Sequence, residues 1–164
     1  MRESQKTLSE KLTAAVASGD VAAMCDLIAA GADVNCRDAQ GFTPLMLAAY
    51  SWEIRGDFRE GVRLLLDAGA DVDAANISGH TALMLASIYG LKDMAKMLVD
   101  NRADIDKRSC SGLSAEDMAR QNGHADIVAL LQKTRAERRS ASAERVAEYL
   151  KERARHYKRP DFKP

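Results

Sequence analysis

The sequence is poor in cysteine, and its cysteines are not arranged for disulfides or for a metal site. Cys25, Cys36 and Cys110 are an odd number, without a CxxC pair or a histidine at metal-ligand spacing. Small disulfide-stabilised proteins and structural zinc sites use even numbers and close spacings. The pattern therefore favours a reducing compartment, and it predicts no metal ion.

Long hydrophobic runs and catalytic motifs are also missing. No apolar run approaches the roughly 20 residues of a membrane-spanning helix, and residues 1–20 lack the apolar core of a secretory signal. His80, His124 and His156 lie far apart, and no serine or cysteine shares a nucleophile motif with a histidine and an acid. We expect a cytoplasmic protein that is not an enzyme, with no cofactor and no membrane partner.

The charges balance overall but are unevenly distributed. The chain of 164 residues has 24 Lys and Arg and 24 Asp and Glu, and 46% of it is hydrophobic. Residues 133–164 hold eleven of the basic residues and only five of the acidic ones. We therefore expect a folded acidic body and a basic C-terminal segment.

The sequence does contain a repeated phrase, GFTPLMLAAY at residues 41–50 and GHTALMLASI at residues 79–88. Aligning the units on Gly41, Gly79 and Gly112 gives separations of 38 and 33 residues. An upstream segment, LTAAVASGDVAAMCDLIAAGA, has the helical part of a unit without the leading turn. A fixed period of this length indicates four stacked units, of which the first is truncated.

Each unit predicts a turn followed by two short antiparallel helices. The glycine permits a tight turn, and a hydroxyl residue two positions later can cap the next helix, as Thr43 does before Pro44. Aspartates recur in pairs before the glycine, which a calcium site could explain, but they lack an EF-hand spacing and favour turn closure. These aspartates are Asp33, Asp38, Asp71, Asp73, Asp104 and Asp106.

With DAQGFTPLMLAA, NISGHTALMLAS, GADVN and GADVD, the sequence resembles the ankyrin repeat family over about residues 8–132. The resemblance implies an all-α fold, an ankyrin-repeat solenoid of stacked helix-turn-helix units with short hairpin turns, here followed by a C-terminal helix. We divide the chain into an ankyrin repeat domain, 1–132, and a basic amphipathic helix and tail, 133–164. Met46 and Met84 depart from the family's usual histidine, and Arg102 replaces the helix-ending glycine found at Gly31 and Gly69.

The resemblance also implies where a partner protein would bind. Members of the family hold partners with the turn tips and the exposed side of the first helices, which together line a concave groove. Tyr50 with Ser51, Ile88 with Tyr89, and Arg120 with Gln121 follow the small residues of the first helices and are expected to be exposed. The candidate binding residues are Arg37, Gln40, Phe42, Tyr50, Trp52, Ile77, His80, Ile88, Tyr89, Arg108, Leu113 and Arg120.

The second unit has five extra residues, near 52–56, which we expect between its two helices. Trp52, Ile54 and Phe58 lie in or beside this insertion. They either cover the second unit or place Trp52 beside Tyr50 as a binding anchor, and the sequence does not distinguish these alternatives.

The C-terminal segment predicts a separate helix, capped by Ser140 or Ser142 and ended by Pro160, with an apolar stripe at steps of three and four residues. The stripe either docks on the last repeat or binds a partner's groove. Alternatively, basic residues contact nucleic acid or an acidic partner, and these are Arg138, Arg139, Arg153 and Arg155.

We therefore interpret the chain as a non-catalytic protein-protein interaction module, acting as an adaptor, scaffold or inhibitor and monomeric on its own. The alternative is a regulatory protein whose basic C-terminal helix contacts nucleic acid or an acidic partner. The absence of interleaved aromatic residues in that helix favours the first interpretation.

Overall fold

A computed structural model describes residues 2–55 and 59–156, and within them it contains eight α-helices. The helices are α1 (Arg2–Ser18), α2 (Val21–Ala29), α3 (Pro44–Arg55), α4 (Arg59–Asp67), α5 (Ala82–Tyr89), α6 (Lys92–Asp100), α7 (Ala115–Gln121) and α8 (Ala125–His156). Consecutive helices pair as four helical hairpins, so the prediction of an all-α repeat fold is confirmed. None of these described helices is long and apolar enough to cross a bilayer.

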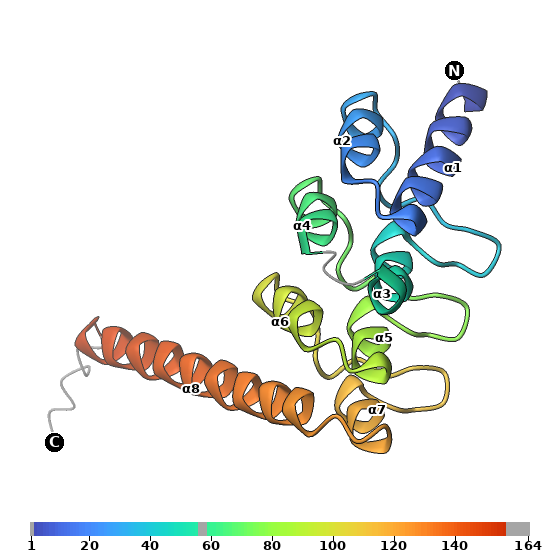
Figure 1. Cartoon of the computed structure of the whole chain (residues 1–164). Helices are drawn as coiled ribbons and strands as arrows, with labels where there is room; N and C mark the ends of the chain where they lie inside the picture. Colours follow the sequence, from blue (N-terminus) through green and yellow to red (C-terminus); the bar gives the residue numbers. More distant parts are fainter. Residues whose placement is uncertain (1, 56–58, 157–164) are drawn as a thin grey trace, which may run out of the picture.

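The four helix pairs stack in two rows (Figure 1). α3 packs between α1 and α5, and α7 packs on α5 to continue that row, while α2, α4, α6 and the start of α8 form the second row. The connections between successive repeats project as loops from the first row, on the side away from the second. This arrangement gives the stack a surface made of loops and first helices.

The helix starts predicted from hydroxyl residues are confirmed. The Thr81 hydroxyl accepts a hydrogen bond from the Met84 amide at 3.3 Å, and the Thr43 hydroxyl accepts one from the Met46 amide at 3.4 Å. Ser114 forms a reciprocal capping box with Asp117 at the start of α7. Each bond satisfies an amide that has no partner within its own helix.

Small and flexible apolar side chains explain why the first helices approach closely. Ala48, Ala86 and Ala119 are completely buried in this row. Met46 and Met84, which replace a polar residue of the family, have exposed fractions of 0% and 1%. A thioether fills a buried space at the start of a helix without requiring a hydrogen-bond partner.

The inter-repeat loops are tight turns held by side chains, as expected for the recurring aspartates. The Asp38 carboxylate accepts hydrogen bonds from the amides of Gln40 and Phe42, at 2.8 and 2.9 Å. Asp33, Asp71 and Asp104 each accept a bond from the amide two residues later. The turn interpretation is therefore confirmed for these four residues.

Neighbouring turns are also joined to one another. The Ile77 amide donates to the Gln40 carbonyl at 3.2 Å, and the Cys110 amide donates to the Ser78 carbonyl at 3.0 Å. Gly79 has φ of +75°, and a Cβ on it would lie 2.7 Å from the Cys110 nitrogen. Glycine is required here both for the left-handed backbone and for the approach of the next turn.

Three predictions about element boundaries are wrong. The insertion does not lie wholly between helices, because residues 52–55 extend α3, which has 12 residues against 8 in α5. α1 begins at Arg2, well before the first predicted helix. α8 is continuous over 32 residues, so Ser140 and Ser142 lie inside a helix and cap nothing. The segment QKTRAERR contains no glycine or proline that would stop the helix.

Docking of the C-terminal stripe on the last repeat is also contradicted. Ala143, Val146, Ala147 and Leu150 are all exposed, and this half of α8 extends away from the stack (Figure 1). The predictions that concern the side chains of Trp52, Ile54 and Phe58, and the tail 157–164 with Pro160, lie outside the described residues.

Candidate protein-binding surface

Three aromatic rings from two repeats form a row on the loop side of the first helices. The rings of Phe42 and Tyr50 lie 5.7 Å apart in an edge-to-face arrangement, and those of Tyr50 and Tyr89 lie 5.2 Å apart. Tyr50 is 43% exposed, while Phe42 and Tyr89 are half-buried. The rings support one another and leave the central ring open to solvent.

The row is continuous with the turn tips. Ile77 at the second tip is 66% exposed, and its amide is bonded to the first tip, next to Phe42. A β-branched or aromatic side chain held on ordered backbone loses little freedom when it is covered. Ile77 and Tyr50 therefore give this side two fixed apolar groups that a partner could bury.

Two arginines predicted as binding residues brace the turns. Arg37 donates to the carbonyl of Ala75 in the next repeat at 2.6 Å, and Arg108 donates to the Gly112 carbonyl of its own turn at 2.6 Å. Both side chains are exposed, although each uses guanidinium donors to hold the turn. Their first role is to fix the shape of the surface, and the Arg108 guanidinium also lies 3.5 Å from the Asp117 carboxylate.

The other predicted binding residues differ in how far they are exposed to solvent. Gln40 and Arg120 are exposed, and Arg120 pairs with Glu116 at 2.8 Å. His80, Ile88 and Leu113 are only half-buried and partly available.

Ser51 was expected to be exposed, but it is 5% exposed and donates to the Leu47 carbonyl at 3.1 Å. It falls on the side of α3 that faces α1, since its hydroxyl also lies 3.5 Å from the Ala17 carbonyl.

Sequence analysis missed two residues that shape the tips. Asn76 and Ser109 occupy the position of Asp38, three residues before each turn glycine. The Asn76 side-chain oxygen accepts from the amides of Ser78 and His80, at 3.0 and 2.9 Å. The spacing of three residues before glycine is a signal that could have found them.

A buried ion pair ties α8 to the end of the stack. Arg135 donates to Glu116 at 2.5 Å and, through Nε, to Asp106 at 3.0 Å. The hydrogen bond that Glu116 accepts from Arg135, followed by one from Gln132, lowers the pKa of the Glu116 carboxyl, and donating to Glu116 in turn raises the pKa of Arg135. Glu116 is 8% exposed, so its charge needs these partners.

Arg135 also takes the place of a missing repeat. Within the stack, Asn35 accepts a bond from the Asp71 amide and Asp73 accepts one from the Asp104 amide, at 2.7 and 2.8 Å. Asp106 is the next acceptor in this series, and a side chain from α8 satisfies it instead of a following turn.

The four arginines predicted to contact acidic partners have different environments. Arg138 donates to the carbonyls of Ala103 and Val99, at 2.9 and 3.2 Å, and so closes the end of α6. Arg139, Arg153 and Arg155 are exposed on the projecting part of α8. Arg138 therefore serves the fold, and only the other three remain candidates for such contacts.

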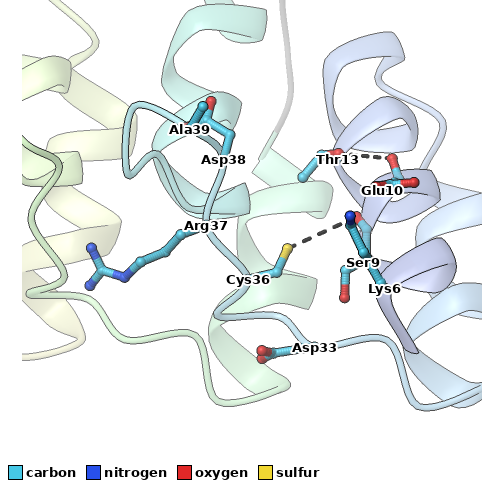
Figure 2. Close-up of a pocket in the computed structure, with 9 residues that line it drawn as sticks. All are labelled: Lys6, Ser9, Glu10, Thr13, Asp33, Cys36, Arg37, Asp38 and Ala39. Atoms are coloured by element: carbon cyan, nitrogen blue, oxygen red, sulfur yellow. Dashed lines mark hydrogen bonds between the residues drawn. The ribbon is translucent and has the colours of Figure 1, made fainter. Parts of the chain in front are cut away.

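A separate pocket of about 560 Å³ lies between α1 and the first turn (Figure 2). Lys6, Glu10 and Arg37 line it together with Cys36, whose thiol points toward α1 and contacts the Ser9 carbonyl at 3.9 Å. Burial, followed by the negative charge of Asp33, raises the pKa of the Cys36 thiol. The thiol is therefore a weak nucleophile at neutral pH.

His124 has a structural environment. His124 Nε2 lies 3.0 Å from the Ile88 carbonyl, and the imidazole packs against Gly90. Among the described residues, no three metal-ligating side chains are grouped closely enough to hold an ion.

The comparison with known proteins agrees with this architecture. A family model described as ankyrin repeats (3 copies) matches residues 12–109 and 55–141. The chain belongs to the ankyrin repeat family. Two ankyrin repeat proteins of Rickettsia felis are each 53% identical to it over 49 residues, which is 30% of this chain and 76% and 73% of theirs.

Ankyrin repeats are generally protein-protein interaction modules, and the family is generally non-enzymatic. In this ankyrin stack the loop side of the first row carries the exposed aromatic and aliphatic groups. The Glu116 and Arg135 network and the His124 contact stabilise the repeats.

Proposed function

We propose that this ankyrin stack binds a partner protein through the concave side formed by the turn tips and the first helices. The observation that carries the proposal is the ring row of Phe42, Tyr50 and Tyr89, whose central ring is 43% exposed. Binding energy concentrates on rigid aromatic side chains near the centre of an interface. The mechanism is binding alone, as in an adaptor, scaffold or inhibitor, and the free thiols of all three cysteines suit the cytoplasm.

The row is suited to binding because it is already ordered. Tyr50 contacts rings on both sides, at 5.7 and 5.2 Å, so little rotamer freedom is lost when a partner covers it. Arg37 and Arg108 hold the neighbouring turns, which keeps Ile77 and the tips in place. A partner with an apolar ridge and polar edges fits this surface best.

The test is capture of a partner from cell extract by immobilised full-length protein. Tyr50→Ala with Tyr89→Ala should remove the captured protein, since loss of two interface aromatics costs about 100-fold or more in affinity. Tyr50→Phe with Tyr89→Phe keeps the rings and should retain capture. Tyr149→Ala removes a 57% exposed tyrosine from α8, outside the stack, as the matched control. Equal capture by the double alanine variant, with unchanged circular dichroism, would refute the assignment.

The exposed Arg139, Arg153 and Arg155 support a second candidate, contact of α8 with nucleic acid or an acidic partner. Three glutamates, Glu144, Glu148 and Glu152, lie between Arg139 and Arg153 and reduce the net positive charge. Salt separates the candidates, because phosphate binding weakens with a log-log slope of about 0.9 per neutralised phosphate. An aromatic contact changes little over the same range.

A further inference from the structure

The projecting half of α8 carries an apolar stripe that no other described segment covers. Ala143, Val146, Ala147 and Leu150 follow one another at steps of three and four residues, and thus share one side of the helix. Val146 is 55% exposed and Leu150 is 58% exposed. With Arg139 and Ser142, they line a shallow surface depression.

Charged residues beside this stripe are sorted by sign along the helix. At about 100° per residue, Glu144, Lys151 and Arg155 fall on one flank of the stripe, while Glu148 lies farther round the helix. The acidic residue of this flank comes first and the two basic residues follow. The opposite flank holds Tyr149, whose hydroxyl accepts a hydrogen bond from Arg153 at 3.1 Å.

We propose that this stripe pairs with the same stripe of a second copy, with the two helices antiparallel. In an antiparallel pair related by a two-fold axis, the charged flanks of both helices lie on the same side and run in opposite directions. The acidic half of each flank then faces the basic half of the other. A parallel pair would instead set the charged flank against the flank of Tyr149 and Arg153.

The register follows from the charges. Setting Glu144 of one copy opposite Lys151 of the second copy places the two-fold axis between residues 147 and 148. By that symmetry the second ion pair forms as well, and the four apolar residues of one stripe interleave with those of the other. Within the part of the chain that the structure describes, Glu144 accepts a long bond of 3.4 Å from Ser140 of its own helix, which leaves its carboxylate within reach of such a partner.

The overlap that this register produces matches the free part of the helix. Residue 139 lies opposite residue 156, so the pair spans about 18 residues, or about 27 Å. Arg138 is the last residue of α8 that bonds to the stack, and the described side chains from Arg139 onward are exposed. The two ankyrin stacks therefore sit at opposite ends of the helix pair and do not compete for space.

This pairing goes beyond the proposed function and is independent of it. Specific stable interfaces bury about 1,200 Å² or more, and a single helix pair with an overlap of about 27 Å is a small interface, so we expect a weak dimer that forms reversibly with concentration. The dimer would present two aromatic binding surfaces in one particle, and a partner with two sites would gain avidity from it. The monomer expected from the sequence is then the species that predominates at low protein concentration.

Sedimentation velocity of the full-length protein, from about 10 µM to about 1 mM, tests the pairing. We expect the average mass to rise toward twice the chain mass of 17.9 kDa. Leu150→Glu should abolish the rise, because it buries two charges at the centre of the interface. A wild-type protein that stays monomeric throughout, or a dimer unaffected by Leu150→Glu, would overturn the proposal.

Charge reversal tests the antiparallel register. Glu144→Lys or Lys151→Glu alone sets like charges opposite each other twice, and each should weaken the dimer about tenfold. The two substitutions together should restore it, since every pair is then reversed. Arg145→Glu, on the side away from the stripe, is the matched control and should change nothing. Single reversals without effect, or a double variant as weak as the singles, would exclude this register. Tyr50→Ala with Tyr89→Ala should dimerise normally.

Discussion

The contact between neighbouring turns gives a sharp test of how the stack is held together. Gly79 and Gly112 occupy the same position in successive repeats and have nearly the same φ, +75° and +78°. A Cβ on Gly79 would lie 2.7 Å from the Cys110 nitrogen and 3.1 Å from Ser109, whereas a Cβ on Gly112 meets nothing within 4 Å. Alanine at these two sites therefore separates backbone strain from repeat stacking.

The expected magnitudes differ clearly. Gly112→Ala should destabilise the fold by about 1 to 2 kcal/mol, the cost of a left-handed conformation for a residue with a Cβ. Gly79→Ala should carry the same backbone cost and a further destabilisation of about 1 to 3 kcal/mol. The added Cβ pushes the next turn away and strains the bond from the Cys110 amide to the Ser78 carbonyl. Gly41→Ala should fall between them, since its Cβ would lie 3.2 Å from the Ile77 nitrogen.

Urea unfolding followed by circular dichroism measures these differences. The free energy of unfolding should be highest for Gly112→Ala, intermediate for Gly41→Ala and lowest for Gly79→Ala. If Gly79→Ala and Gly112→Ala agree within about 0.5 kcal/mol, the turns do not constrain one another as the structure indicates.

Two further predictions concern single residues. Arg102 has φ of +68°, so Arg102→Gly should stabilise the protein by about 0.5 to 1 kcal/mol, and an unchanged or lower melting temperature would contradict this. The pKa of Glu116 is lowered by Arg135, so its contribution to stability is complete above the ordinary value of 4.5 and is lost as pH falls toward the lower pKa of the folded state. Glu116→Gln should therefore reduce the loss of stability on acidification, measured as urea midpoints from neutral to acid pH, and an acid dependence identical to the wild type would disprove the pairing.

Much of the fold could be predicted because the signals are local and recur. Thr43, Thr81 and Ser114 directly precede α3, α5 and α7 and cap them. The turn glycines recur at a spacing close to the length of an ankyrin repeat. Arg102 was recognised from its alignment with Gly31 and Gly69, and its φ is positive, as it is at those two glycines. Each of these features depends on a few adjacent residues, which is why a single sequence reveals them.

Other features depend on residues far apart in the chain and could not be predicted. Arg138 was expected to face a partner, but it bonds to carbonyls 35 and 39 residues earlier. Ser51 was expected on the surface, but it is buried, and its hydroxyl lies 3.5 Å from the carbonyl of Ala17, 34 residues earlier. The apolar stripe of α8 was readable from its spacing, yet its exposure follows from the direction in which the continuous helix leaves the stack (Figure 1).

The amino-acid pattern alone determined the repeats, the capped helices and the apolar and basic faces, because these arise from periodicity and from hydrogen bonds between near neighbours. Tertiary structure alone decided which rings contact one another, which arginines are hydrogen-bonded to carbonyls and carboxylates of the stack, and which side of α8 remains exposed to solvent. Those outcomes depend on distances between repeats, which no short stretch of chain encodes.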